Sequence, residues 1–223
     1  MNHLHRVMLA ALSAVAEGCV DTGAGGPTIA DVAADQLSIQ PSIIDDDPAP
    51  ADGKVPIVVQ FYRGTQFVEL ASNSVVICNG VPIPWSTVGY TARVPLVAPG
   101  GSLAFVHSRT GVTTQAVVKV PPRPVLTSPM EGELLGRLAP LTLHYAASSS
   151  AGVRPGASDG RTTLNGNEQP DNGTATLDVG MLGAGAGTVQ ISRRVVSTPT
   201  GTGFASVLAT YTIVSPVTRV TWQ

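Results

Sequence analysis

The chain has 223 residues, the length of one or two ordinary domains, and its formal net charge of −2 gives no reason to propose nucleic acid as a partner. Hydrophobic residues make up 43% and charged residues 13%, a balance that argues against global disorder and for a buried core. Only 4% of the residues are aromatic, whereas Val, Thr, 24 Gly and 18 Pro are abundant. Because β-branched residues fit pleated surfaces and Gly and Pro form turns, this composition predicts an all-β fold of short strands.

The first 19 residues have the pattern of an export signal. The apolar run Val7–Ala16 is shorter than the about 20 residues of a transmembrane helix, but it suits the hydrophobic region of a secretory signal. Ala14-Val15-Ala16 is an A-x-A cleavage site. Alternatively, Ala16-Glu17-Gly18-Cys19 resembles the lipobox of bacterial lipoproteins, a resemblance that implies lipidation of Cys19 and attachment to a membrane. Both interpretations predict an extracytoplasmic protein, either secreted or lipid-anchored at the bacterial cell surface.

The two cysteines, Cys19 and Cys78, allow three states. Lipidation of Cys19 would leave Cys78 as the only thiol of the mature chain. Cleavage after Ala16 would instead permit a Cys19–Cys78 disulfide in an oxidising compartment. The third state, which we expect, is Cys78 as a small buried hydrophobic residue in a strand.

Residues 20–53 are predicted to form a flexible acidic linker, within which residues 28–37 could form a short helix. Between residues 17 and 52 the chain has no Lys or Arg and eight acidic residues: Glu17, Asp21, Asp31, Asp35, Asp45, Asp46, Asp47 and Asp52. Asp45-Asp46-Asp47 lacks the spacing of oxygen ligands around a glycine turn that a Ca²⁺ loop requires.

Residues 54–121 are predicted to form a first small antiparallel β-sandwich. Val55, Ile57, Val59 and Phe61 alternate with the period of a half-buried strand. Asn79-Gly80 lies between the apolar runs 75–78 and 81–83 and predicts a hairpin with a type I′ turn. The return strand carries prolines and should be brief or lie at an edge. Further strands are expected at 66–70, 90–96, 102–107 and 112–120.

Four prolines mark the boundary between modules: Pro121, Pro122, Pro124 and Pro129. Consecutive prolines favour an extended, stiff conformation and exclude a helix or a central strand. We therefore interpret residues 118–129 as an elbow between two modules.

Residues 122–223 are predicted to form a second β-sandwich of about seven short strands, with immunoglobulin-like spacing. The expected strands include 141–145, 174–179, 188–196, 204–214 and 217–222, of which 204–214 should be the longest. Residues 148–152 and 159–160 are expected to be turns.

This module contains the motifs Ser128-Pro129, Leu141-Thr-Leu143, Asp171-Asn-Gly-Thr-Ala-Thr-Leu-Asp-Val179 and Gly185-Ala-Gly-Thr-Val189. Together they resemble the immunoglobulin-like modules of secreted and surface-anchored bacterial proteins. The resemblance covers about residues 125–222. The two cysteines of antibody-type domains are missing from it. It implies a binding or spacing role and transfers no catalytic residue.

The sequence offers little catalytic chemistry. Residues 54–223 contain two histidines, His107 and His144, and none of the motifs H-E-x-x-H, C-x-x-C, G-x-S-x-G or G-x-x-x-x-G-K. We therefore predict no catalytic, cofactor-binding or metal-binding residues and a non-enzymatic protein. In the tandem Arg193-Arg194, alternation predicts one exposed arginine.

The first module has four large aromatic residues available for binding: Tyr62, Phe67, Trp85 and Tyr90. Trp85 follows a proline-rich turn, a position where carbohydrate-binding modules often display a stacking platform. Trp85 and Tyr90 are thus candidate ligand-binding residues. The alternative for Trp85 is a structural role, capping the core at a loop.

The favoured hypothesis is an exported, cell-surface-associated, non-enzymatic protein whose tandem modules serve as adhesion, interaction or spacer domains. Its partner would be a cell-surface protein or a polysaccharide. One alternative is a carbohydrate-binding protein that uses Trp85 and Tyr90. A second alternative is a hydrolase, which would need acids or histidines that converge in a cleft.

Overall fold

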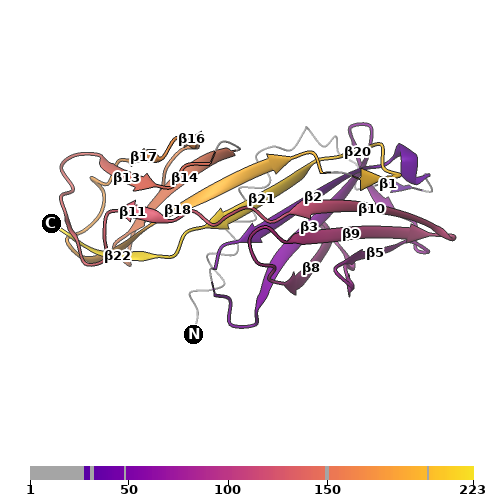
Figure 1. Ribbon diagram of the computed structural model, residues 1–223, viewed down its shortest axis with the longest axis horizontal. Helices are drawn as coiled ribbons and strands as arrows, with labels where there is room; N and C mark the ends of the chain where they lie inside the picture. Colours follow the sequence, from indigo (N-terminus) through magenta and orange to yellow (C-terminus); the bar gives the residue numbers. More distant parts are fainter. Residues whose placement is uncertain (1–27, 31–32, 48, 149–150, 200) are drawn as a thin grey trace.

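The computed structural model describes residues 28–30, 33–47, 49–148, 151–199 and 201–223. Within these residues the fold is all-β, and the only helix is the single 3-10 turn η1 (Ala34–Gln36). The molecule is elongated, with one sandwich at each end (Figure 1). The predicted all-β class is confirmed, but the large sheet is mixed and not purely antiparallel, because β1–β4, β2–β20, β2–β21 and β12–β22 pair in parallel.

One large sheet runs through both ends of the molecule. Its 14 strands follow the path β1-β4-β3-β2-β21-β18-β14-β15, with the remaining six paired off this path. The strands are β1 (Thr28–Ala30), β2 (Ser38–Asp45), β3 (Lys54–Arg63), β4 (Gln66–Leu70), β7 (Trp85–Ser86), β8 (Gly89–Pro95), β12 (Leu134–Leu135), β14 (Ala151–Ser158), β15 (Thr163–Asn165), β16 (Gln169–Pro170), β18 (Gly185–Ser197), β20 (Ser206–Val207), β21 (Ala209–Val214) and β22 (Thr218–Trp222).

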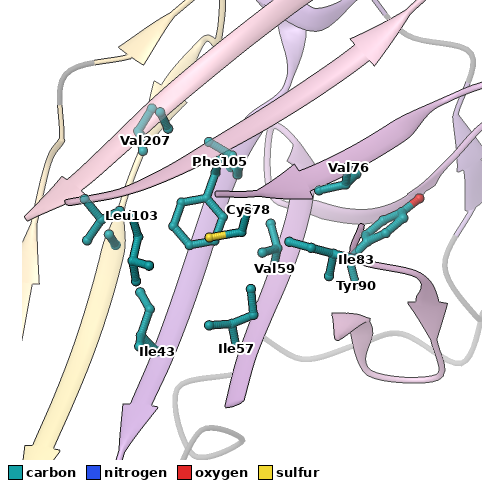
Figure 2. Close-up of a cluster of buried hydrophobic side chains, with 14 of the residues drawn as sticks. Ile43, Ile57, Val59, Val76, Cys78, Ile83, Tyr90, Leu103, Phe105 and Val207 are labelled. Carbon is teal, nitrogen blue, oxygen red and sulfur yellow. The ribbon is translucent and has the colours of Figure 1, made fainter. Parts of the chain in front are cut away.

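Two smaller sheets complete the sandwiches. The first has the order β19 (Gly201–Thr202), β10 (Val112–Lys119), β9 (Ser102–Arg109), β5 (Val75–Cys78) and β6 (Val81–Pro82). It encloses the first core, part of which is drawn in Figure 2. The second has the order β11 (Leu126–Ser128), β13 (Leu141–Tyr145) and β17 (Thr174–Leu177), and its buried residues belong to the second core.

Local sequence patterns explain the first module well. In β3 every second residue from Val55 to Phe61 is buried, as the alternation predicts. Asn79 and Gly80 both have positive φ, 45° and 82°, and they connect paired Cys78 and Val81, which confirms the type I′ hairpin. The return strand β6 is two residues long and lies at the edge of its sheet, also as predicted.

The predicted linker differs from the structure in its second half. Within residues 20–53, β2 forms a central strand that pairs with β3 on one edge and with β20 and β21 on the other. Leu37, Ile39 and Ile43 of this segment are buried in the first core. These apolar residues occupy alternate positions, which indicates a strand, but the many aspartates around them favoured the interpretation as a linker. The helix considered for residues 28–37 is likewise replaced by β1 and η1.

The predicted boundary between residues 121 and 122 does not separate the two modules. After building most of the second module, the chain returns to the first, where Val207, Ala209 and Tyr211 are buried. It then crosses back, and β22 places Val220 and Trp222 in the second core. The crossing is possible because β18, at 13 residues the longest strand, pairs with β22 in its first half and with β21 in its second half.

The strand β14 was missed because its sequence is rich in turn formers. Pro155 lies in its middle, opposite Ile191 of β18. On the other edge of β14, β16 pairs with Gly152 and Val153 whereas β15 pairs only from Gly156 onward. Pro155 therefore falls between these two ladders, where its missing N–H is tolerated.

Candidate functional site

Three half-buried aromatic side chains form a strip on the outer face of the first module. Tyr62 on β3 pairs with Phe67 on β4, and their ring centroids are 5.7 Å apart. Phe67 in turn stacks on Trp85 of β7, also at 5.7 Å. In β3 and β4 these aromatics alternate with buried Phe61 and Val68, so the two-residue period of the strands places them on the outer face.

Tyr90 anchors this strip to the core. β8 pairs with β3 up to Val59, and β4 pairs with the same edge of β3 from Phe61 onward, so the two strands diverge there. The Tyr90 hydroxyl spans the divergence by accepting a hydrogen bond from the Leu70 backbone N–H at 3.1 Å. The side chain is only 6% exposed, and burial raises the pKa of its hydroxyl, which keeps it protonated at neutral pH.

A pocket of about 420 Å³ opens beside Trp85. It is lined by the segment from Glu69 to Val76, by Pro82–Trp85 and by Tyr90. The Ser74 hydroxyl oxygen is buried there and has no hydrogen-bond partner among the described residues. The pocket thus combines an aromatic rim with polar groups that retain hydrogen-bonding capacity, as small-molecule sites do.

The structure brings the two predicted ligand-binding residues into one pocket but gives them different roles. Trp85 is half-buried and accessible from outside, with its ring 5.2 Å from that of Tyr90. Tyr90 is a core residue in edge contact with Phe61 and can offer a ligand only its hydroxyl. The stacking of Phe67 on Trp85 could not be read from the sequence, since it depends on how β4 and β7 meet.

Two arginines, half-buried Arg123 and fully buried Arg193, hold the junction between the modules. Arg123, in the proline-rich elbow, donates from Nη2 to Asp45 Oδ1 at 2.6 Å and from Nη1 to the Val214 carbonyl. Arg123 thereby ties the elbow to β2 and β21. Burial raises the pKa of the Asp45 carboxyl, an effect that the hydrogen bond from Arg123 opposes.

Arg193 forms the second tie. Its Nε donates to Asp171 Oδ2 at 2.6 Å, Nη2 donates to the Ala146 carbonyl at 2.6 Å, and Nη1 donates to the Pro122 carbonyl at 3.2 Å. The elbow is therefore fastened to both modules and is not a free spacer. The sequence did not reveal that Arg193 is the buried member of Arg193-Arg194, nor that Asp171 is its partner.

The two histidines of residues 54–223 do not lie in a common site. His107 is buried in the first module, whereas His144 is exposed on β13 of the second. Among the described residues, no group of three or more His, Cys, Asp or Glu is placed to hold a metal ion. Likewise, no helix in the described part of the chain is long and apolar enough to span a membrane.

Cys78 is a fully buried free thiol, which agrees with the structural role expected for it (Figure 2). Burial raises the pKa of the Cys78 thiol to about 12, so the reactive thiolate is suppressed. Cys19 and the predicted signal segment lie outside the described residues.

Comparison with known proteins gives distant structural similarity. No family model and no curated protein matches the chain. Among solved structures, it is similar to the fibronectin(III)-like modules of CbhA from Clostridium thermocellum, with 12% identity, coverage of 91% of this chain and 90% of that chain, and a TM-score of 0.27.

A second similar structure is SGBP-B of the mixed-linkage glucan utilization locus of Bacteroides ovatus, in complex with a mixed-linkage heptasaccharide. Identity is 13%, the alignment covers 86% of this chain and 47% of that chain, and the TM-score is 0.21. Both TM-scores are low.

Proposed function

We propose that the protein is an exported, non-enzymatic interaction protein whose two modules form one rigid unit at the cell surface. The observation that carries this proposal is the junction. The sheet is continuous between the modules. The partly buried pair Arg123–Asp45 and the buried pair Arg193–Asp171 fasten the elbow to it.

Rigidity follows from the hydrogen bonding. Bending between the modules would break the ladder in which β18 pairs with β21 from Ser192 to Ser197. It would also expose or separate buried charges, which is costly. A unit of fixed shape suits a spacer or an adhesion protein, because it holds its binding face at a set distance and orientation.

A non-enzymatic function is supported by the pairing of buried aspartates with arginines. The side chains of Asp45 and Asp171 are only 2% and 1% exposed, and each carboxylate is paired with an arginine. The hydrolase alternative has no observation in its favour.

Export and anchoring are tested by fractionating cells that express the full chain. We expect the protein outside the cytoplasm, in the detergent phase after Triton X-114 partitioning, with Cys19→Ser moving it to the aqueous phase. Cys78→Ser is the matched control and should leave partitioning unchanged. An aqueous unsubstituted protein would exclude the lipid anchor, and a cytoplasmic one would contradict the proposal as a whole.

Polysaccharide binding at the Trp85 pocket is a second candidate function. It is favoured by the strip of Tyr62, Phe67 and Trp85 beside a pocket with polar groups, because sugar rings present an apolar face to aromatic rings and hydroxyls to polar groups.

This second function is tested by affinity electrophoresis in gels containing soluble polysaccharides. Trp85→Ala should abolish retardation by any polysaccharide that the unsubstituted protein binds. Leu138→Ala, which removes a fully exposed apolar side chain of the second module, should not change it. Retardation that survives Trp85→Ala would exclude this site.

A further inference from the structure

Glu69 gives the Trp85 pocket a negative charge. It is half-buried and lines the pocket together with Trp85. It lies two residues after Phe67 on β4, so the two-residue period of the strand places both side chains on the outer face. Besides burial, the charge of Glu69 raises the pKa of the Tyr90 hydroxyl, as expected when the carboxylate lies near that hydroxyl. The carboxylate and the aromatic strip therefore share one site.

Glu69 has no basic partner among the described residues. The lining of the pocket contains no Lys, Arg or His. Glu69 also forms no salt bridge within the part of the chain that the structure describes. Around a half-buried charge the effective dielectric constant is lower than in water, so its attraction for a cation is stronger. The pocket therefore favours a cationic group and repels an anionic one.

Two hydroxyl groups add hydrogen-bonding capacity to the pocket. The Ser74 hydroxyl oxygen is buried, and native proteins rarely leave such a group without the polar partner that it lacks among the described residues. The Tyr90 hydroxyl accepts the Leu70 N–H, and its own proton remains available to a ligand oxygen. In Figure 2 this hydroxyl points away from Cys78 and Phe105 of the core. Both hydroxyls can therefore bind the hydroxyl groups of a ligand.

These groups together match the chemistry of an amino sugar. An ammonium group satisfies Glu69 with a charge-assisted hydrogen bond, and sugar hydroxyls satisfy Ser74 and Tyr90. The apolar face of a sugar ring packs on the aromatic wall that Trp85 provides. A neutral sugar would instead cover the Glu69 carboxylate without supplying a counter-charge, which costs free energy. An acidic sugar would add charge repulsion.

We propose that the Trp85 pocket recognises amino sugars, with the ammonium group of a glucosamine unit paired with Glu69. This inference rests on the second candidate function, the binding of a polysaccharide at this pocket. It names the class of polysaccharide, one whose sugars carry free amino groups.

The test compares two tetramers of the same linkage, one of glucosamine and one of N-acetylglucosamine, by isothermal titration calorimetry of the full chain at constant ionic strength. The pH is kept below the pKa of the sugar amine, so that only the glucosamine tetramer is cationic. We expect this tetramer to bind at least about tenfold more tightly, because it gains a charge-assisted hydrogen bond. Glu69→Gln keeps the size of the side chain and should weaken binding of the glucosamine tetramer about tenfold, without weakening binding of the acetylated one.

Glu131→Gln is the matched control, because it removes the same charge from the exposed surface of the second module, and it should leave both affinities unchanged. A glucosamine tetramer that does not bind, or that binds Glu69→Gln as tightly as the unsubstituted protein, would overturn this inference. An acetylated tetramer that binds equally well, and is lost in Trp85→Ala, would also overturn it while leaving the second candidate function in place. Thermal unfolding of each variant verifies that its fold is retained.

Discussion

Adjacent arginines on β18 illustrate how much the environment of a single residue matters. Alternation predicted that one of Arg193 and Arg194 is exposed, and Arg194 is. The other, Arg193, is only 2% exposed and is paired with Asp171. A buried charge is tolerated only with such a partner and full hydrogen bonding, and the carbonyls of Ala146 and Pro122 provide the rest.

We predict that Arg193→Ala lowers the free energy of unfolding by about 3–5 kcal/mol, because it leaves Asp171 buried without its counter-charge. Arg194→Ala is the matched control one residue away and should change it by less than about 0.5 kcal/mol. Urea denaturation measures both. Equal effects would mean that Asp171 finds another partner or becomes hydrated.

The carboxylate of Asp159 fastens the turn after β14. It accepts backbone hydrogen bonds from Arg161 and Thr162, at 2.8 and 2.6 Å, and from Gly183 at 2.6 Å. These bonds favour the ionised form and lower the pKa of Asp159 from 3.8 to about 2.

Because the folded-state pKa of Asp159 is depressed, its stabilisation is present above pH 3.8 and is lost as the pH falls toward 2. We expect thermal unfolding of Asp159→Asn to depend less on pH over this interval than that of the unsubstituted protein. Asp45 contributes with the opposite sign, since burial raises its pKa and its ionisation opposes folding as the pH rises above 3.8. Identical pH profiles for the two proteins would contradict the role of Asp159.

At the scale of elements, the pairing of β18 with β22 depends on one glycine. Trp222 is buried and donates from its indole Nε1 to the Ser158 carbonyl at 3.1 Å, crossing β18 beside Gly187. A Cβ at position 187 would overlap the indole ring and lie 2.5 Å from the Ser158 carbonyl oxygen. Only glycine leaves room for this contact.

We therefore predict that Gly187→Ala destabilises the protein by about 1–3 kcal/mol through overpacking and red-shifts the tryptophan fluorescence as Trp222 becomes exposed. Gly136→Ala is the control, because a Cβ there meets no atom within 4 Å. Unchanged fluorescence and stability in Gly187→Ala would show that β18 and Trp222 can separate without cost.

At the scale of the whole molecule, the elbow and the shared sheet act together. A free proline elbow would become more flexible if its prolines were replaced, but here Arg123 and Arg193 bind it to both modules. We predict that substituting Pro121, Pro122 and Pro124 by Gly and Ser leaves the distance distribution from small-angle X-ray scattering unchanged. A broader distribution would show that the prolines, and not the sheet, hold the modules in place.

Because the chain crosses between the modules more than once, we can predict which fragments of the protein fold on their own. A fragment of residues 54–121 lacks β2, which covers one edge of β3, and β21, which pairs with the other edge of β2. These two strands supply Ile43 and Tyr211 to the first core. We expect this fragment to be unfolded by circular dichroism, whereas residues 28–223 fold. A folded 54–121 fragment would mean that the first core needs neither strand.

Much of the fold was predictable because strands and tight turns are specified by neighbouring residues. Alternation located β3 and β13, and Asn79-Gly80 identified a hairpin whose φ angles those two residues accept. The strand β14 escaped detection because its glycines and proline are tolerated only through partners on both edges. For the candidate site, the sequence predicted the residues Trp85 and Tyr90 but not the pocket that they line.

By itself, the sequence determined the all-β class, most strands and the type I′ turn, since these depend on side-chain periodicity and backbone preference over a few residues. Tertiary structure alone decided that β2 and β20 lie side by side, with Ser38 and Ser206 hydrogen-bonded across 168 positions of sequence. It also decided which charges are buried and where cavities form. The physical reason is that burial and pairing depend on partners distant in the chain, which no local pattern encodes.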